Sequence, residues 1–135
     1  MNVLVVEPGT LPYEKEIDGL KEMQALMGGS IQAIYPYKEP VAIVCNGEGL
    51  LLELPFNRSV EGGYGGVLGN FFVCGLTADD FCSLTPEQMQ TYKKEFHFAE
   101  IPIAYQGNEV ITLKVQAESK NKPPKEKQRD APERG

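Results

Sequence analysis

Residues 24–58 read QALMGGSIQAIYPYKEPVAIVCNGEGLLLELPFNR, and this stretch decides the fold of the chain. The Gly28-Gly29 pair predicts the end of a helix, because glycine readily adopts the left-handed conformation that caps one. The apolar runs 31–35 and 41–45 predict two strands, separated by a short segment with a proline at each end. So short a connection favours antiparallel pairing of the two strands.

A hairpin turn is predicted at Asn46-Gly47-Glu48-Gly49, since Asn-Gly is favoured where a tight turn needs positive φ angles. This turn would join the strand at 41–45 to a further strand over 50–54, LLLEL. Asn57-Arg58 follows at the point where the chain leaves the predicted sheet.

The residues before this stretch predict one strand and one helix. The apolar run 3–6 is bounded by Pro8-Gly9, which is typical of a buried strand. Pro12 suits the first position of a helix, where its missing N–H costs nothing. We expect that helix to reach Gly28, with an apolar stripe formed by Ile17, Leu20, Met23 and Met27.

The residues after it predict a strand, a second helix and a last hairpin. The apolar run 67–73 follows the glycine-rich segment EGGYGG and predicts a strand. Thr85-Pro86-Glu87-Gln88 is a capping box with proline at the first helical position, so the second helix begins there. The runs 101–105 and 110–115 predict a terminal hairpin.

These elements follow the order β-α-β-β-β-β-α-β-β. The hairpins outnumber the helices, so we expect an α+β fold with a curved, mainly antiparallel sheet covered by two helices. A single domain over 1–117 fits the length of the chain. Residues 118–135 contain three prolines and no large apolar residue, which predicts a disordered, basic and polar tail.

Composition and charge restrict the function. The chain has no apolar run of membrane-spanning length and no basic segment at its start, so we expect a cytoplasmic protein without a membrane partner. Three separated cysteines predict reduced, buried thiols. Residues 1–117 carry seven Lys or Arg against fifteen Asp or Glu, an acidic balance that disfavours direct binding of nucleic acid by the globular body.

The chain resembles the domain-of-unknown-function family 3846 in four successive motifs. These are VLVVEPG, IDGLKEMQALMGGSIQ, VCNGEGLLLELPFNR and the pair GNFFVCG and DDFCSLTPEQ. The resemblance covers about residues 2–90. It implies a small accessory protein encoded on phages, plasmids or conjugative elements, and it implies no catalytic residues.

One polar cluster is a candidate ligand site. Arg58 offers five donors in a fixed geometry that suits a carboxylate or a phosphate. Asn57 is its neighbour, Asn46 and Glu48 come from the preceding turn, and Tyr64 lies in a glycine-rich loop that could close over a ligand. The alternative is an ordinary ion pair between Arg58 and a carboxylate such as Glu53 or Glu61.

The other polar patterns favour structural roles. Asp79-Asp80 lacks further oxygen ligands at a recognisable spacing, which favours a polar turn over a Mg²⁺ site. Ser83 and the single His97 do not form a recognisable hydrolase pattern. We therefore expect no metal, no cofactor and no catalytic residues, and we lean against an enzyme.

The leading hypothesis is a non-enzymatic binding module of a mobile genetic element that binds a small anionic ligand or a host protein. A second hypothesis is an acidic protein–protein antagonist or nucleic-acid mimic, and a third is a small hydrolase or transferase. The strand edges predicted over 102–105 and 110–115 also make a homodimer an open alternative.

Overall fold

Antiparallel strands build the main sheet of this protein, whose computed structural model describes residues 1–62, 64–107 and 109–120. Within those residues the strand order is β2-β1-β7-β4-β3, and a short strand β8 also pairs with β7. The strands are β1 (Asn2–Val6), β2 (Tyr13–Glu16), β3 (Ile31–Ile34), β4 (Val41–Asn46), β7 (Phe71–Leu76) and β8 (Phe81–Cys82). Together with two helices, this sheet confirms a mixed α+β fold with mostly antiparallel strands.

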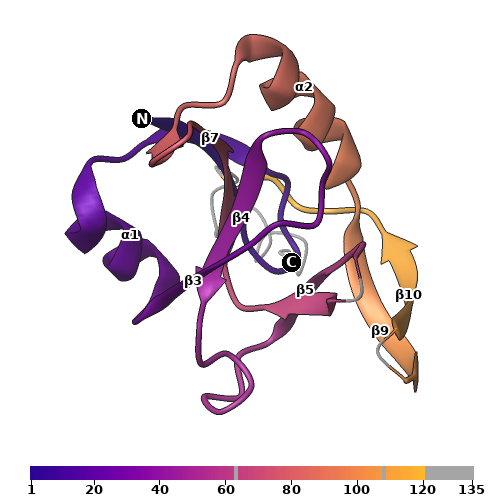
Figure 1. Ribbon diagram of the computed structural model, residues 1–135. Helices are drawn as coiled ribbons and strands as arrows, with labels where there is room; N and C mark the ends of the chain where they lie inside the picture. The colour runs from indigo at the N-terminus through magenta and orange to yellow at the C-terminus, as the bar shows by residue number, and fades with distance from the viewer. Residues whose placement is uncertain (63, 108, 121–135) are drawn as a thin grey trace, which may run out of the picture.

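Both faces of the central strands β1, β4 and β7 are buried, which explains their continuous apolar sequences. Helix α1 (Gly19–Met27) packs against one face, where successive strands contribute alternate residues such as Val3, Val44 and Phe72. Helix α2 (Pro86–Glu95) packs against the opposite face (Figure 1). Strands covered on both sides lose the apolar-polar alternation of a half-exposed sheet.

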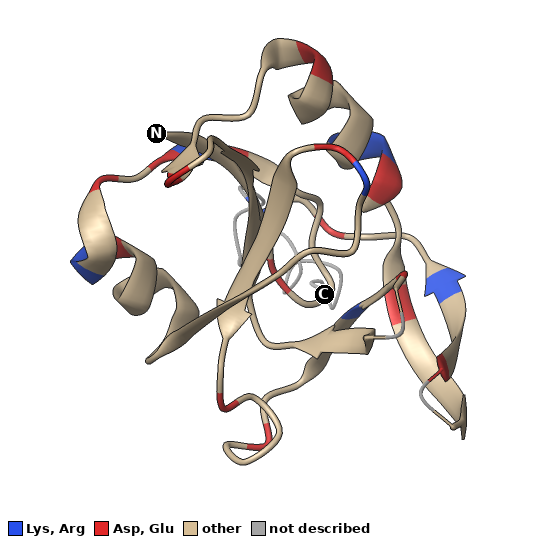
Figure 2. Ribbon diagram, viewed as in Figure 1, with Lys and Arg blue, Asp and Glu red and all other residues tan. Residues whose placement is uncertain are grey.

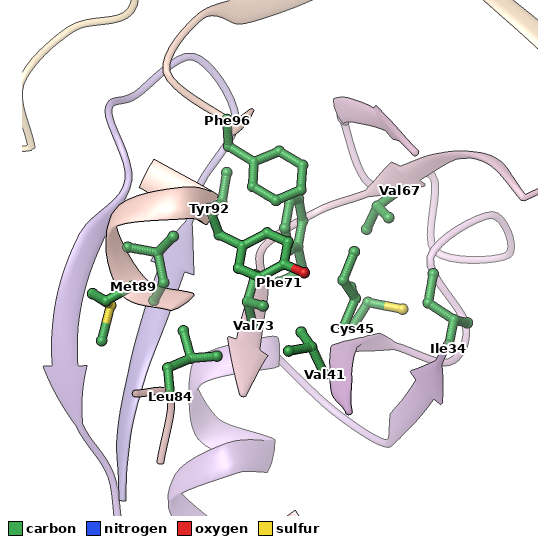
Figure 3. Close-up of a cluster of buried hydrophobic side chains, with 13 residues drawn as sticks. Ile34, Val41, Cys45, Val67, Phe71, Val73, Leu84, Met89, Tyr92 and Phe96 are labelled. Atoms are coloured by element: carbon green, nitrogen blue, oxygen red, sulfur yellow. The ribbon is translucent and has the colours of Figure 1, made fainter. Parts of the chain in front are cut away.

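The core on the α2 side is rich in aromatic residues (Figure 3). Phe71 of β7 meets Phe96, at the end of α2, edge to face with ring centroids 5.1 Å apart. Tyr92 and Met89 point from α2 into the same cluster. This packing fixes the end of α2 over the middle of the sheet.

Two further hairpins lie on the α2 side of the molecule. β5 (Phe56–Val60) pairs with β6 (Gly65–Leu68), and Val67 of β6 belongs to the core on that side. β9 (Ala99–Gln106) pairs with β10 (Glu109–Val115), and Figure 1 shows this hairpin beyond β5 at the rim of the molecule. The Glu100 carboxylate joins the two hairpins by accepting hydrogen bonds from the Ser59 amide and hydroxyl.

Several predicted elements are confirmed. Gly28 ends α1 in the left-handed conformation, with a φ of 81°. The capping box of α2 is complete, since the Thr85 hydroxyl accepts from the Gln88 amide and the Gln88 side chain accepts from the Thr85 amide. The terminal hairpin and the strand at 41–45 also form.

The helix predicted from Pro12 was wrong in its first part. Residues Tyr13–Glu16 form β2 instead, because they pair with the otherwise open edge of β1. Helix α1 begins only at Gly19. The positive φ of this residue, 82°, is not helical and prevents the helix from extending towards Pro12. The local signal for a helix start at Pro12 was therefore outweighed by the pairing of β2 with β1.

The strand predicted over 50–54 was also wrong. Residues 48–54 form a helix-like turn, in which the Leu52 amide donates to the Glu48 carbonyl and the Leu54 amide to the Gly49 carbonyl. β4 lies between β3 and β7, so neither of its edges is open to a returning strand. The turn must therefore project away from the main sheet.

The single strand predicted over 67–73 is divided into β6 and β7. Gly69, with a φ of 79°, makes the break, and its amide donates to the Pro55 carbonyl. Because the chain changes direction at Gly69, β6 leaves the main sheet and pairs with β5. The sequence did not predict β5. The observed order therefore differs from the expected one by the added strands β2, β5 and β8, by the division of 67–73 into β6 and β7, and by the missing strand at 50–54.

The first residues of the expected tail, 118–120, contact the loop that follows β1. The Leu11 amide donates to the Glu118 carbonyl, and the Glu118 amide donates to the Gly9 carbonyl. Lys120 forms an ion pair with Glu7. The rest of the predicted tail, residues 121–135, lies outside the described residues. Neither of the described helices has the length and apolarity needed to cross a membrane.

We predict that Phe71→Ala lowers the free energy of unfolding by about 3–5 kcal/mol, because it removes a buried ring and leaves a cavity. Phe98→Ala is the matched control, since Phe98 is exposed and contacts only the His97 ring among aromatic partners described. We expect it to cost less than about 1 kcal/mol. Urea denaturation measures both, and equal losses in the two variants would contradict this core assignment.

Candidate functional site

Arg58 lies inside the protein and not at its surface. Both Asn57 and Arg58 have no exposed surface. The ladder of β5 and β6 shifts register between Phe56 and Arg58. A bulge of this kind turns successive side chains away from strict alternation, which allows two neighbouring polar residues to be buried together.

Three hydrogen bonds hold the Arg58 guanidinium. Nη1 donates to Asn57 Oδ1 at 2.9 Å, and Nη2 donates to the Thr10 carbonyl at 2.7 Å and to the Phe96 carbonyl at 3.0 Å. Asn57 Nδ2 donates in turn to the carbonyls of Val6 and Gly69. We call Asn57, Arg58 and these four carbonyls the Arg58 cluster, which ties β5 to the ends of β1, β6 and α2.

The Arg58 cluster keeps its charge. Burial lowers the pKa of the guanidinium to about 10, and the nearby Glu100 carboxylate opposes this shift, so Arg58 stays protonated at neutral pH. Arg58 Nε has no hydrogen-bond partner in the described part of the protein. A buried charge is costly unless it is well bonded, and the three acceptors of this cluster meet most of that need.

The structure does not present Arg58, the predicted anion-binding residue, at the surface. Its guanidinium is out of reach of solvent, and two of its donors are already bonded to backbone carbonyls. No ion pair with Glu53 or Glu61 forms among the described residues either. Arg58 and Asn57 therefore serve the fold.

We predict that Arg58→Lys lowers the free energy of unfolding by about 2–4 kcal/mol, because an ammonium group cannot reach three acceptors in the geometry of a guanidinium. Lys93→Met is the control, since Lys93 forms only a surface ion pair with Glu14. We expect that loss to stay near 0.5 kcal/mol or below. Chemical denaturation compares them, and a fully stable Arg58→Lys protein would refute the structural role.

Asn46 and Glu48, two other predicted site residues, act on the turn. Asn46 is buried, and its Nδ2 donates to the Met27 carbonyl at the end of α1. Its Oδ1 accepts from the Glu48 amide at 2.7 Å. Asn46 therefore satisfies the helix end and starts the turn at once, while the Glu48 side chain is exposed.

Tyr64 is exposed and stands beside this turn. Its hydroxyl accepts a hydrogen bond from the Tyr35 amide at 3.4 Å. A hollow of about 260 Å³ brings Tyr64 together with Asn46, whereas Arg58 and Asn57 do not line it. The predicted cluster is thus divided between a surface hollow and the buried Arg58 cluster.

A second hollow of about 340 Å³ adjoins the first and is more apolar. The two share Leu50, Tyr64, Gly66 and Leu68. The second extends towards the tip of the β9–β10 hairpin. We call their joined apolar lining the leucine groove, formed by Leu50, Phe56, Tyr64, Leu68, Tyr105 and Val110.

Glycine keeps the floor of the leucine groove low. A Cβ on Gly66 would lie 2.5 Å from the Phe56 ring, so any larger residue would displace the ring. The absence of a side chain here lets the groove reach the backbone of β6.

Leu50 lines both hollows, and two further exposed leucines follow it on the same turn. Leu50, Leu51 and Leu52 are 82%, 78% and 50% exposed, at the tip of the turn between β4 and β5. These exposed leucines were not predicted, because LLLEL is typical of a strand. No local signal reveals them, since their exposure depends on both edges of β4 being occupied.

A third hollow, of about 430 Å³, is acidic. Glu61, Glu95, Glu100 and Glu109 line it together with Lys114. Glu100 is already bonded to Ser59 and to the Thr112 hydroxyl. No group of three His, Cys, Asp or Glu in the described ranges is placed to hold a metal ion.

The remaining polar candidates lie in local structural contacts. Asp80 accepts from the Phe81 amide and closes a turn with Thr77. The Ser83 hydroxyl accepts from the Asn2 amide. His97 packs edge to face against Phe98. These contacts are structural, and none of them joins Ser83 to His97.

The cysteines are not all buried as expected. Cys45 and Cys74 are buried, and Cys82 is partly exposed. Burial raises the pKa of the Cys45 thiol. Burial also raises the pKa of the Cys74 thiol to about 12, with smaller effects from Cys82 and Asp80.

We predict that iodoacetamide labels Cys82 first at mildly alkaline pH, and the two buried thiols at least about tenfold more slowly, because the thiolate is the reactive form. Peptide mass spectrometry resolves the three positions. The denatured chain is the control, in which all three should react at similar rates. Equal labelling of Cys74 and Cys82 in the folded protein would be the contrary result.

The fold and this surface define a small α+β domain with an apolar groove beside a leucine-rich turn. The chain belongs to the family described as Domain of unknown function (DUF3846), whose model matches residues 1–97. The match confirms the resemblance and extends it through α2. The β9–β10 hairpin lies beyond the matched residues. Neither a curated protein nor a solved structure matches the chain.

Proposed function

We propose that this chain is a non-enzymatic binding module that holds an apolar segment of a partner protein in the leucine groove. The observation that carries the proposal is the exposure of Leu50, Leu51 and Leu52 at one tip. Contiguous apolar surface on a soluble domain is typical of an interaction site. Burying one such leucine contributes about 1.5–3 kcal/mol to binding.

The groove is supported from below, which limits the cost of binding. Asn46 fixes the start of the turn, and the Gly69 amide fixes its return through the Pro55 carbonyl. The Arg58 cluster holds β5 under the groove. A site that is already ordered loses little conformational entropy when a partner binds.

The charges around the groove select the partner. Glu48 and Glu53 flank the leucines, and Glu109 lies at the far end. Figure 2 shows the acidic positions on the turn between β4 and β5. An apolar segment with flanking Lys or Arg residues would complement this rim, and added salt should weaken its binding.

A protein segment fits better than the small anionic ligand considered from the sequence. Asn46 uses both of its amide atoms within the protein, and Arg58 is buried. The groove therefore offers few free polar groups with which to orient a small polar molecule. The mobile-element origin implied by the family resemblance makes a host protein the partner of choice, and the genes beside relatives of this chain would test that part.

Panning a random dodecapeptide library on the immobilised chain tests the proposal. We predict that the enriched peptides combine large apolar residues with Lys or Arg. Leu50→Glu should weaken their binding by about tenfold or more, as measured by fluorescence polarisation, because Leu50 lines the groove and the variant puts a charge where apolar surface is buried.

Leu20→Glu is the matched control, since Leu20 is an exposed leucine on α1, on the other side of the sheet. It should bind the peptides like the parent protein. Peptides that bind Leu50→Glu and the parent equally well would overturn the proposal, as would a library from which nothing is enriched. Circular dichroism confirms that each variant is folded.

A further inference from the structure

The β9–β10 hairpin exposes apolar residues on one of its faces. The register places Ile101 opposite Leu113 and Ala104 opposite Ile111, and opposite residues of an antiparallel pair share a face. Ile101, Ile111 and Leu113 are all exposed. The other face turns towards β5, where Glu100 accepts from Ser59 and Thr112.

The two strands of this hairpin differ in how their edges are protected. β9 contains Pro102, and its register shifts beside this residue. Proline and bulges are the usual devices that prevent a strand edge from pairing with another chain.

The middle of β10 has none of these devices, and its charged residues, Glu109 and Lys114, lie towards its ends. Its middle residues, Val110-Ile111-Thr112-Leu113, include no charge and no proline. Among the described residues, β10 pairs only with β9, and its backbone forms no hydrogen bond beyond that pair. Figure 1 shows β10 at the rim of the molecule.

We propose that β10 pairs antiparallel with β10 of a second copy of this chain, so that the two hairpins form one four-stranded sheet. A two-fold axis at Thr112 would place Ile111 opposite Leu113 of the second copy. The same register sets Lys114 opposite Val110, so no like charges face each other. A two-fold contact of this kind is closed and does not continue into a fibre.

A second copy suits this edge for two physical reasons. A two-stranded hairpin is only marginally stable by itself, and a wider sheet satisfies the open backbone groups of β10. The pairing also brings together the apolar faces of both hairpins, since Ile111 and Leu113 lie on the same face. The sequence Ile-Thr-Leu is self-complementary about its central residue, which favours an identical strand as the partner.

Sedimentation velocity of the full chain at about 100 µM tests the proposal. We expect a species of twice the 14.9 kDa chain mass. The double substitution Ile111→Lys and Leu113→Lys should give monomers at that concentration, because lysines would then face lysines across the axis twice.

Ile101→Lys with Ile103→Lys is the matched control. It adds the same charge to β9, one strand away from the proposed contact, and should remain dimeric. Its dissociation would show that the apolar faces stack and would overturn edge pairing. A parent chain that is monomeric at about 100 µM would also overturn the proposal.

Charge complementation tests the register directly. Ile111→Glu with Leu113→Glu should also be monomeric alone. An equimolar mixture with the double lysine variant should form a heterodimer in native mass spectrometry, because each lysine then faces a glutamate. A mixture that stays monomeric would refute the proposed register. Peptide binding by the leucine groove is a separate measurement, so either proposal can fail alone.

Discussion

The burial of one arginine constrains this structure more than any other interaction. A charged guanidinium inside a small domain is tolerated only when most of its donors are bonded, and Arg58 meets most of this need with two backbone carbonyls and the Asn57 amide oxygen. Those carbonyls belong to the loop after β1 and to the end of α2. The segments that supply them must therefore converge on β5, which orders the α2 side of the molecule.

The leucine groove is a consequence of this convergence. β5 and β6 are held on the α2 side, and the main sheet has no open edge beside β4, so residues 48–54 must form a turn that projects into solvent. Leu50, Leu51 and Leu52 are exposed for that reason. The proposed function therefore depends on the fold, since the packing of β5 and β6 on the α2 side both buries Arg58 and leaves the leucines of the turn exposed.

The sequence predicted the elements whose signals are local. The capping box of α2, the glycine end of α1 and the terminal hairpin were all found, because each depends on a few neighbouring residues. β2 and β5 were missed because their pairing partners are strands elsewhere in the fold. The strand at 50–54 was wrongly predicted since nothing local reveals that both edges of β4 are occupied.

The candidate site shows the same division. Asn46, from the turn, and Tyr64, from the glycine-rich loop, line one hollow. Arg58 was expected at the surface, because arginine is usually exposed and no sequence pattern announces the bulge that buries it. The exposed leucines were hidden within an apolar run typical of a strand. Burial of polar residues and exposure of apolar ones both depend on tertiary structure.

Hydrogen exchange of the Arg58 side chain, followed by NMR, tests the central claim most directly. The signals are assigned by their loss in Arg58→Lys. If the guanidinium is buried and bonded, its Nη hydrogens should exchange at least about a hundredfold more slowly than those of free arginine at the same pH. Exchange at the rate of free arginine would mean that Arg58 is open to solvent. That result would contradict the claim that the loop after β1 and the end of α2 are held together by a buried guanidinium.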